Sequence, residues 1–205
     1  TGSVFLERCT AEQSGRNGVQ VDGAASVTLT DVEARINPER GIYVLNTAGP
    51  VSVAGALAEL NGHRGIDVTV GGGATIQDSG SHGNTQRGFS VEGPGPFVLT
   101  GLTADDNGEE NIWVQTDGSV SLASSTADNS GYDGVLLDAL GTVEVSGLTV
   151  TNSTERGLNV ETESDVTVTG VDATSSGEHG IRVQTTAGVR LEECTSTGNL
   201  NGHGI

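Results

Sequence analysis

Residues 134–138 read GVLLD, and residues 157–161, which follow 23 places later, read GLNVE. The same glycine followed by an aliphatic residue or Phe recurs at Gly18, Gly41, Gly65, Gly88, Gly134, Gly157, Gly180 and Gly204, and Asn111 fills the one remaining slot. Successive copies lie 23 or 24 residues apart. A fixed period of this length is typical of repeat proteins, so each period is expected to form one coil of a solenoid.

Each repeat alternates apolar and polar residues in three short pieces. With the recurring glycine as position 1, apolar residues occupy positions 2 and 4, then 10 and 12, then 15 and 17. Alternation with a period of two residues indicates strands that bury one face. The sequence therefore predicts an all-β fold, a single right-handed parallel β-helix of about 23 residues per coil with three short strands in each coil. We expect it to fill residues 1–205 as one domain.

Position 20 of the repeat carries a run of small polar residues, with Asn37, Asn61, Asn84, Asn107 and Asn199 in five coils and serine in three others. Side chains at the same position of stacked coils lie one above another. Amides in such a column can bond to the backbone and to each other. We interpret this column as a structural ladder and not as a binding site.

The G-I-x-V coil with an asparagine at its turn resembles the repeat of the pectin-lyase-like superfamily, and the resemblance covers the whole chain. The resemblance implies a parallel β-helix. The superfamily includes polysaccharide lyases, glycosidases, epimerases, phage tailspikes and bacterial surface proteins, so it does not select one function. Leucine-rich repeats have a similar period, but their L-x-x-L-x-L frame is absent here.

The composition excludes several kinds of partner. The net charge is −18, and all nine basic residues are arginine. Such a surface repels phosphate backbones and anionic headgroups, so we expect no nucleic acid partner. No run of 18 apolar residues is present, so we expect no membrane insertion.

Two cysteines occupy position 15 in the first and last coils, as Cys9 and Cys194. Eight coils separate them, which is about 38 Å at the spacing of parallel strands. A disulfide needs Cα atoms within about 7 Å, so no bridge is expected within one chain.

Outward residues of the first strand, at positions 3 and 5, form the first candidate site. In enzymes of the superfamily, sugars often lie along this face. Trp113 could stack on a sugar ring, and two of the carboxylates lie two coils apart, at about 10 Å, near the upper limit for inverting glycosidases. A solvated acidic face is the alternative interpretation. The candidate carbohydrate-binding residues are Tyr43, Glu92, Trp113, Asp138 and Glu161.

Asp105, Asp106 and Asp128 form a second candidate site, because Asp105 and Asp128 are expected to lie on adjacent coils. Paired carboxylates together with turn carbonyls can bind Ca²⁺. However, no D-x-D-x-D loop is present, so a solvated cluster is the alternative. Calcium is the only cofactor that the sequence offers.

The coil length varies by only one residue. Ligand sites are concave, and function tends to lie on inserted loops, which this chain lacks. We therefore expect an extracellular or cell-surface rod with a structural or adhesive role, either a fragment of a longer chain or a repeating unit in one. Its expected partners are further copies, stacked end to end as a fibre, or a surface polysaccharide. The alternative is a carbohydrate-binding or polysaccharide-degrading domain, a lyase or glycosidase, that acts through the first-strand face.

Overall fold

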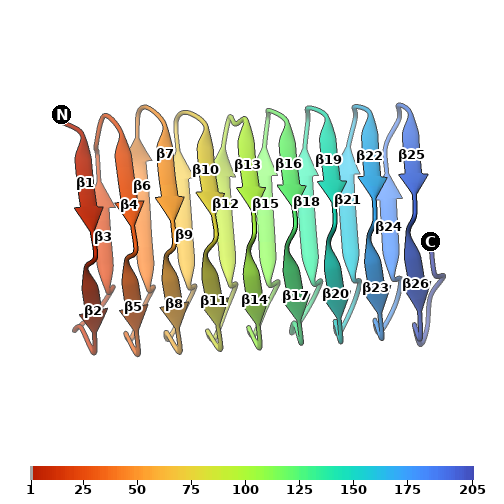
Figure 1. Cartoon of the computed structure of the whole chain (residues 1–205), viewed down its shortest axis with the longest axis horizontal. Coiled ribbons are helices and arrows are strands. Elements are labelled where there is room, and N and C mark those ends of the chain that lie inside the picture. The colour runs from red at the N-terminus through yellow and green to blue at the C-terminus, as the bar shows by residue number, and fades with distance from the viewer. Residues whose placement is uncertain (1) are drawn as a thin grey trace.

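A computed structural model describes residues 2–205 as a regular stack of coils, in which 26 short strands form three sheets (Figure 1). The chain passes through the three sheets in turn, and every strand pairs in parallel with the equivalent strand one coil away, as β1 with β4 and β4 with β7. The predicted parallel β-helix of about 23 residues per coil is confirmed. No helix among these residues is long and apolar enough to cross a membrane.

The first sheet contains the strands that follow the recurring glycine. Its eight strands are β3 (Val19–Asp22), β6 (Ile42–Thr47), β9 (Ile66–Val70), β12 (Phe89–Gly93), β15 (Ile112–Thr116), β18 (Val135–Ala139), β21 (Leu158–Thr162) and β24 (Ile181–Gln184).

The second sheet contains the strands at positions 10 to 13 of each coil. Its nine strands are β1 (Val4–Glu7), β4 (Val27–Thr30), β7 (Val51–Ala54), β10 (Ala74–Gln77), β13 (Phe97–Thr100), β16 (Val120–Ala123), β19 (Val143–Ser146), β22 (Val166–Thr169) and β25 (Val189–Glu192).

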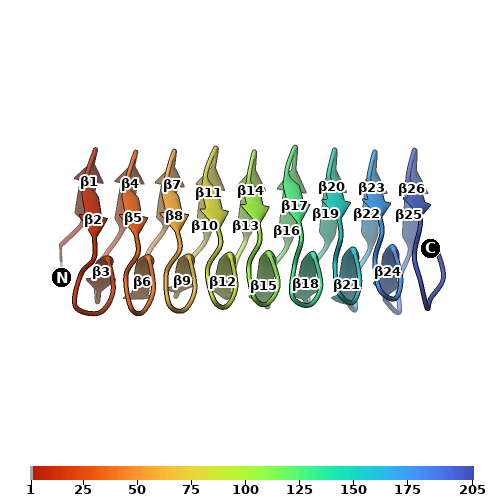
Figure 2. The ribbon, with the colours of Figure 1, turned by 90° about the horizontal axis from the view of Figure 1, so that it is seen from below.

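The third sheet contains the shortest strands, which end before the asparagine column. Its nine strands are β2 (Thr10–Glu12), β5 (Glu33–Arg35), β8 (Leu57–Glu59), β11 (Gly80–His82), β14 (Thr103–Asp105), β17 (Thr126–Asp128), β20 (Thr149–Thr151), β23 (Asp172–Thr174) and β26 (Thr195–Thr197). Seen from below, the first sheet faces the other two across each coil (Figure 2).

The core lies inside the coils and is built from the alternating apolar positions. Leu122, Val145 and Val168 lie in register on neighbouring strands of the second sheet, and each is no more than 1% exposed. A single coil has no apolar face to pack against, so each coil depends on its neighbours for burial. One register shift occurs, between β6 and β9, where the chain carries an additional residue.

The asparagine column forms a continuous hydrogen-bonded ladder. Asn37 Nδ2 donates to Asn61 Oδ1 at 2.9 Å, Asn61 Nδ2 donates to Asn84 Oδ1 at 2.9 Å, and Asn84 Nδ2 donates to Asn107 Oδ1 at 3.0 Å. Asn199 lies at the far end, where its Oδ1 accepts the backbone N–H of Ser176.

The recurring glycine is required because this ladder passes directly over it. A Cβ atom on Gly41 would lie 2.7 Å from Asn61 Nδ2 in the next coil. Asn111 occurs where the next coil supplies Ser130 in place of asparagine. Its Oδ1 accepts from Asn107 Nδ2 at 2.6 Å, and its Nδ2 donates to the carbonyl of Asp128 at 2.7 Å. Asn111 therefore replaces the amide that the next coil lacks.

Candidate functional site

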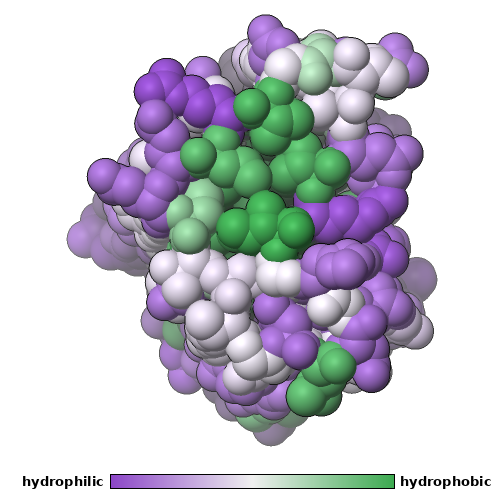
Figure 3. All heavy atoms as spheres, turned by 90° about the vertical axis from the view of Figure 1, so that its right-hand side faces the viewer, coloured by the Kyte–Doolittle hydropathy of each residue, from purple (hydrophilic) through white to green (hydrophobic). Residues whose placement is uncertain are grey.

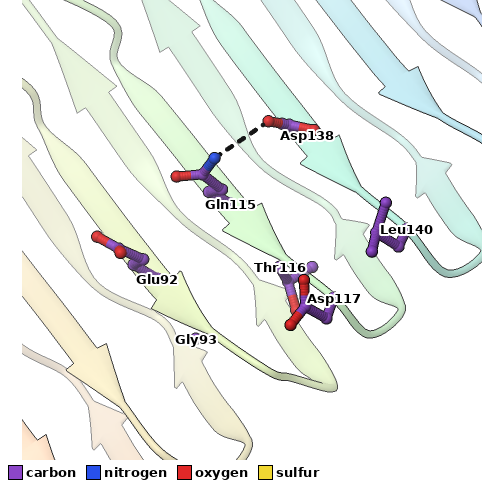
Figure 4. Close-up of a pocket in the computed structure, with 7 residues that line it drawn as sticks. All are labelled: Glu92, Gly93, Gln115, Thr116, Asp117, Asp138 and Leu140. Carbon is purple, nitrogen blue, oxygen red and sulfur yellow. Dashed lines mark hydrogen bonds between the residues drawn. The ribbon is translucent and has the colours of Figure 1, made fainter.

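A shallow groove runs along the stack where strands of the first sheet enter their turns. One hollow of about 410 Å³ is lined by Glu92, Gly93, Gln115, Thr116, Asp117, Asp138 and Leu140 (Figure 4). A second, of about 450 Å³, is lined by Asp138, Ala139, Leu140, Glu161, Thr162, Glu163, Gln184, Thr185 and Thr186. The two hollows share Asp138 and Leu140, so we treat them as one feature, the acidic groove.

Strand geometry places the groove residues. Successive side chains point to opposite faces of a strand, so Glu92, Gln115 and Asp138 project outward from β12, β15 and β18 while their neighbours enter the core (Figure 4). The walls are short turns held by local hydrogen bonds, such as Gly118 N–H to Thr116 Oγ1 at 2.9 Å. The groove is therefore shallow and has no inserted loop above it.

Negative charge dominates the groove. Asp138 accepts a hydrogen bond from Gln115 Nε2 at 3.3 Å, and Glu161 pairs with Arg182 at 2.6 Å. In the part of the chain that the structure describes, Glu92, Asp117 and Glu163 make no ion pair. The groove therefore repels anionic polymers and favours neutral ones.

The five predicted carbohydrate-binding residues are divided between two places. Glu92, Asp138 and Glu161 line the acidic groove, whereas Tyr43 and Trp113 do not. The guanidinium of Arg87 lies 4.1 Å from the centroid of the Trp113 ring, and that of Arg40 lies 4.1 Å from the centroid of the Tyr43 ring. One face of each aromatic ring is thus occupied by a cation of the same chain.

The outward face of the first sheet is covered more than the sequence predicted. Asp67, Ser90 and Asn159 point outward but are only 1–2% exposed. Arg40 Nε lies 2.6 Å from Asp67 Oδ2, and Arg64 Nη1 lies 3.2 Å from the same oxygen. The expectation of a solvated face is therefore wrong at these positions, because arginines from the preceding turn fold across the strands. A single sequence gives no direct signal of this cover.

Trp113→Ala is expected to reduce the free energy of unfolding by about 1–3 kcal/mol, because the change removes the contact with Arg87 and the apolar cover of buried Ser90. Urea unfolding followed by circular dichroism measures this value. Tyr132, which is 48% exposed, provides the matched control: Tyr132→Ala should change stability by less than about 0.5 kcal/mol. Equal effects of the two changes would contradict the assigned role of Trp113.

Asp133 is the most buried carboxylate on the turn that precedes β18. It accepts the backbone N–H of Arg156 at 2.9 Å, Arg156 Nη1 at 3.3 Å and Asn159 Nδ2 at 3.1 Å. Burial raises the pKa of Asp133 above its ordinary value and outweighs the hydrogen bond and positive charge of Arg156, which lower it.

This raised pKa predicts a pH dependence. Just above the ordinary value of 3.8, the folded chain holds a proton on Asp133 that the unfolded chain has released, so its contribution to stability falls as the pH rises. The unfolding free energy of the wild type minus that of Asp133→Asn should therefore decrease between about pH 4 and pH 6. Urea titrations at several pH values measure the difference, and an increase with pH would contradict the prediction.

The predicted calcium residues are not brought together as a ligand set. Asp105 lies 3.0 Å from His82 Nδ1, and Asp106 accepts from Asn129 Nδ2 at 2.6 Å. Asp128 accepts from Thr151 Oγ1 and Asn152 Nδ2. Within residues 2–205, no group of three or more His, Cys, Asp or Glu side chains is arranged to hold a metal ion.

Comparisons with known proteins relate the whole stack to one kind of repeat. The family model described as "right handed beta helix region" matches residues 1–108 and 88–205. No curated protein matches the sequence.

Two solved structures share the fold. Pectate lyase Pel9A has 12% sequence identity and a TM-score of 0.57, and the match covers 96% of this chain and 70% of that one. The A-module of the mannuronan C-5 epimerase AlgE4 from Azotobacter vinelandii has 16% identity and a TM-score of 0.63, and the match covers 94% of this chain and 68% of that one.

Proposed function

Because the chain belongs to the right-handed β-helix family, we propose that it serves as a structural or adhesive rod on the cell surface or outside the cell. One observation carries this proposal: every coil has nearly the same length, so no inserted loop closes a site above the strands. The proposed rod needs no cofactor and no calcium. Its partners are further copies of the chain or a surface polysaccharide.

The charge of the first sheet supports a rod over an enzyme that cleaves anionic polysaccharides. The acidic groove carries carboxylates, and the nearby arginines Arg40, Arg64 and Arg87 are engaged with Asp67, Glu110 and aromatic rings. A polyuronate would therefore meet repulsion without free cationic partners.

Surface exposure in the source cells tests the proposed role. Antibodies against the chain should label intact cells, and a protease added outside should remove the label. The labelled chain should also remain bound to cell-wall material, whereas incubation with pectate or alginate should release no unsaturated uronates that absorb ultraviolet light. Label found only after cell lysis would contradict the surface location, and steady uronate release would replace the rod with a lyase.

The acidic groove supports a second candidate, binding of a neutral polysaccharide. Glu92 and Asp138 project into the same hollow from strands two coils apart (Figure 4). A glycan array with the wild-type chain would identify ligands. Binding through this groove should be lost in Glu92→Gln/Asp138→Asn and retained in Glu144→Gln, which changes an exposed carboxylate on the second sheet. Equal binding by both variants would exclude the groove.

A further inference from the structure

The last coil leaves an apolar face open. Figure 3 looks onto the C-terminal end of the stack and shows a cluster of hydrophobic residues at its centre. A hollow of about 360 Å³ at this end is lined by apolar residues that include Ile181, Val183, Leu191 and Ile205. Val189 is 48% exposed, whereas the equivalent Val166 one coil earlier is 1% exposed. A further coil would bury this face.

The first coil has the side chains that this face requires. Residues 4–9 read VFLERC, and residues 189–194 read VRLEEC. Throughout the stack, equal positions pair in parallel, as Val4 with Val27 and Val166 with Val189. We propose that the end face binds the first coil of a second copy of the chain, docked as the next coil. Val189 and Leu191 would then contact Val4 and Leu6 of the second copy.

Charge at the joint agrees with this register. Glu193 follows β25 at the position that Arg8 occupies after β1, so the two would lie opposite each other. Both side chains are exposed in the single chain, and Arg8 contacts only its neighbour Glu7. Like charges at Glu192 and Glu7 are each compensated by an adjacent arginine, Arg190 and Arg8.

The only two cysteines would meet at the joint. Each thiol lies near the carbonyl two residues earlier, Cys9 Sγ at 3.4 Å from Glu7 O and Cys194 Sγ at 3.2 Å from Glu192 O. Equivalent Cα atoms on adjacent parallel strands are about 4.8 Å apart, inside the range of about 4.4–6.8 Å that a disulfide spans. Within one copy the same cysteines are about 38 Å apart.

The docked copies would extend two sheets without interruption, because β25 would pair with β1 and β26 with β2 of the second copy. In the first sheet, Gly204 and Ile205 would occupy the first two positions of the intervening coil. This inference rests on the proposed rod and deepens it by naming the rod's own partner and the residues at the joint.

Oxidation by a small disulfide, oxidised glutathione, tests the joint. The Cys194 thiolate attacks oxidised glutathione and forms a mixed disulfide, which releases one glutathione thiolate. The Cys9 thiolate of the second copy then attacks the Cys194 sulfur and releases the second glutathione. Two protein thiols are oxidised, one glutathione disulfide is reduced, and the protons pass through solvent to the two glutathione thiolates.

Single-cysteine variants of the full 205-residue chain separate specific stacking from random collision. Cys9→Ser mixed with Cys194→Ser should form a cross-linked dimer roughly tenfold faster than either variant alone. The wild type should form a ladder of oligomers whose peptide maps contain Cys9–Cys194 links. Links that join two Cys9 or two Cys194 residues at equal yield would overturn the proposal.

Charge reversal provides an independent readout. Glu193→Arg should slow cross-linking roughly fivefold, and Arg8→Glu/Glu193→Arg should restore it, while Glu144→Arg in mid-stack should have no effect. Sedimentation in reducing buffer should show association that increases with concentration. A chain that remains monomeric yet labels intact cells would overturn the stacking and leave the proposed rod. A chain that stacks but is absent from the cell surface would overturn the rod's location and leave the stacking.

Discussion

Val145→Asp is expected to destabilise the stack by about 4–7 kcal/mol at neutral pH. Val145 is 1% exposed on β19 and lies in register with Leu122 and Val168, so a carboxylate there has no polar partner. An isolated buried carboxyl avoids ionisation by raising its pKa about 3–5 units, and each unit corresponds to about 1.4 kcal/mol. Because coils contact only their neighbours, the loss should unfold the coils around β19 first.

Urea unfolding and amide hydrogen exchange measure this effect. Ser146→Asp adds the same charge to the next residue, whose side chain is exposed on the outer face of the same strand, and should change stability by less than about 0.5 kcal/mol. The penalty of Val145→Asp should shrink as the pH falls, since the buried carboxyl then starts protonated in the unfolded chain as well. If Val145→Asp and Ser146→Asp unfold at the same urea concentration, the inward assignment of position 12 is wrong.

The sequence predicted the fold well because one physical constraint repeats in every coil. A period of 23 or 24 residues with three alternating pieces can bury its apolar side chains only by stacking, so strand positions and register follow from the repeat alone. The glycine at position 1 was visible as a marker, but its cause was not. The cause is the asparagine of the next coil, which fills the space that a Cβ atom on Gly41 would need.

The candidate site was harder to predict, because it depends on long side chains that cross between coils. The alternation correctly placed Asp67 and Trp113 on the outward side of the first sheet. It could not show that Arg40 and Arg64 would bury Asp67, or that Arg87 would lie over Trp113. Arginine side chains reach across two coils, so their partners follow from rotamers and not from sequence spacing. The acidic groove likewise depends on turn geometry, which the repeat leaves open.

Asn84→Ala is expected to destabilise the stack by about 4 kcal/mol, although the residue lies at a turn. Asn84 Oδ1 accepts the backbone N–H and Nδ2 of Asn61, and its Nδ2 donates to Ala58 O, Ser81 Oγ and Asn107 Oδ1. Alanine would leave several of these buried groups without a partner, and each such group costs about 1–3 kcal/mol.

Asn199→Ala is the matched control, because Asn199 holds the same position in the last coil but is partly exposed and bonds only to Ser176 N–H and Ser196 Oγ. Water can replace those bonds, so its loss should cost about 1 kcal/mol. Urea unfolding of both variants measures the contrast, and hydrogen exchange should locate the Asn84→Ala damage at Asn61. Equal costs for the two variants would mean that the amides act singly and not as a ladder. The expected inequality follows from burial, because the same asparagine at the same coil position stabilises the fold only where neighbouring coils keep water from its partners.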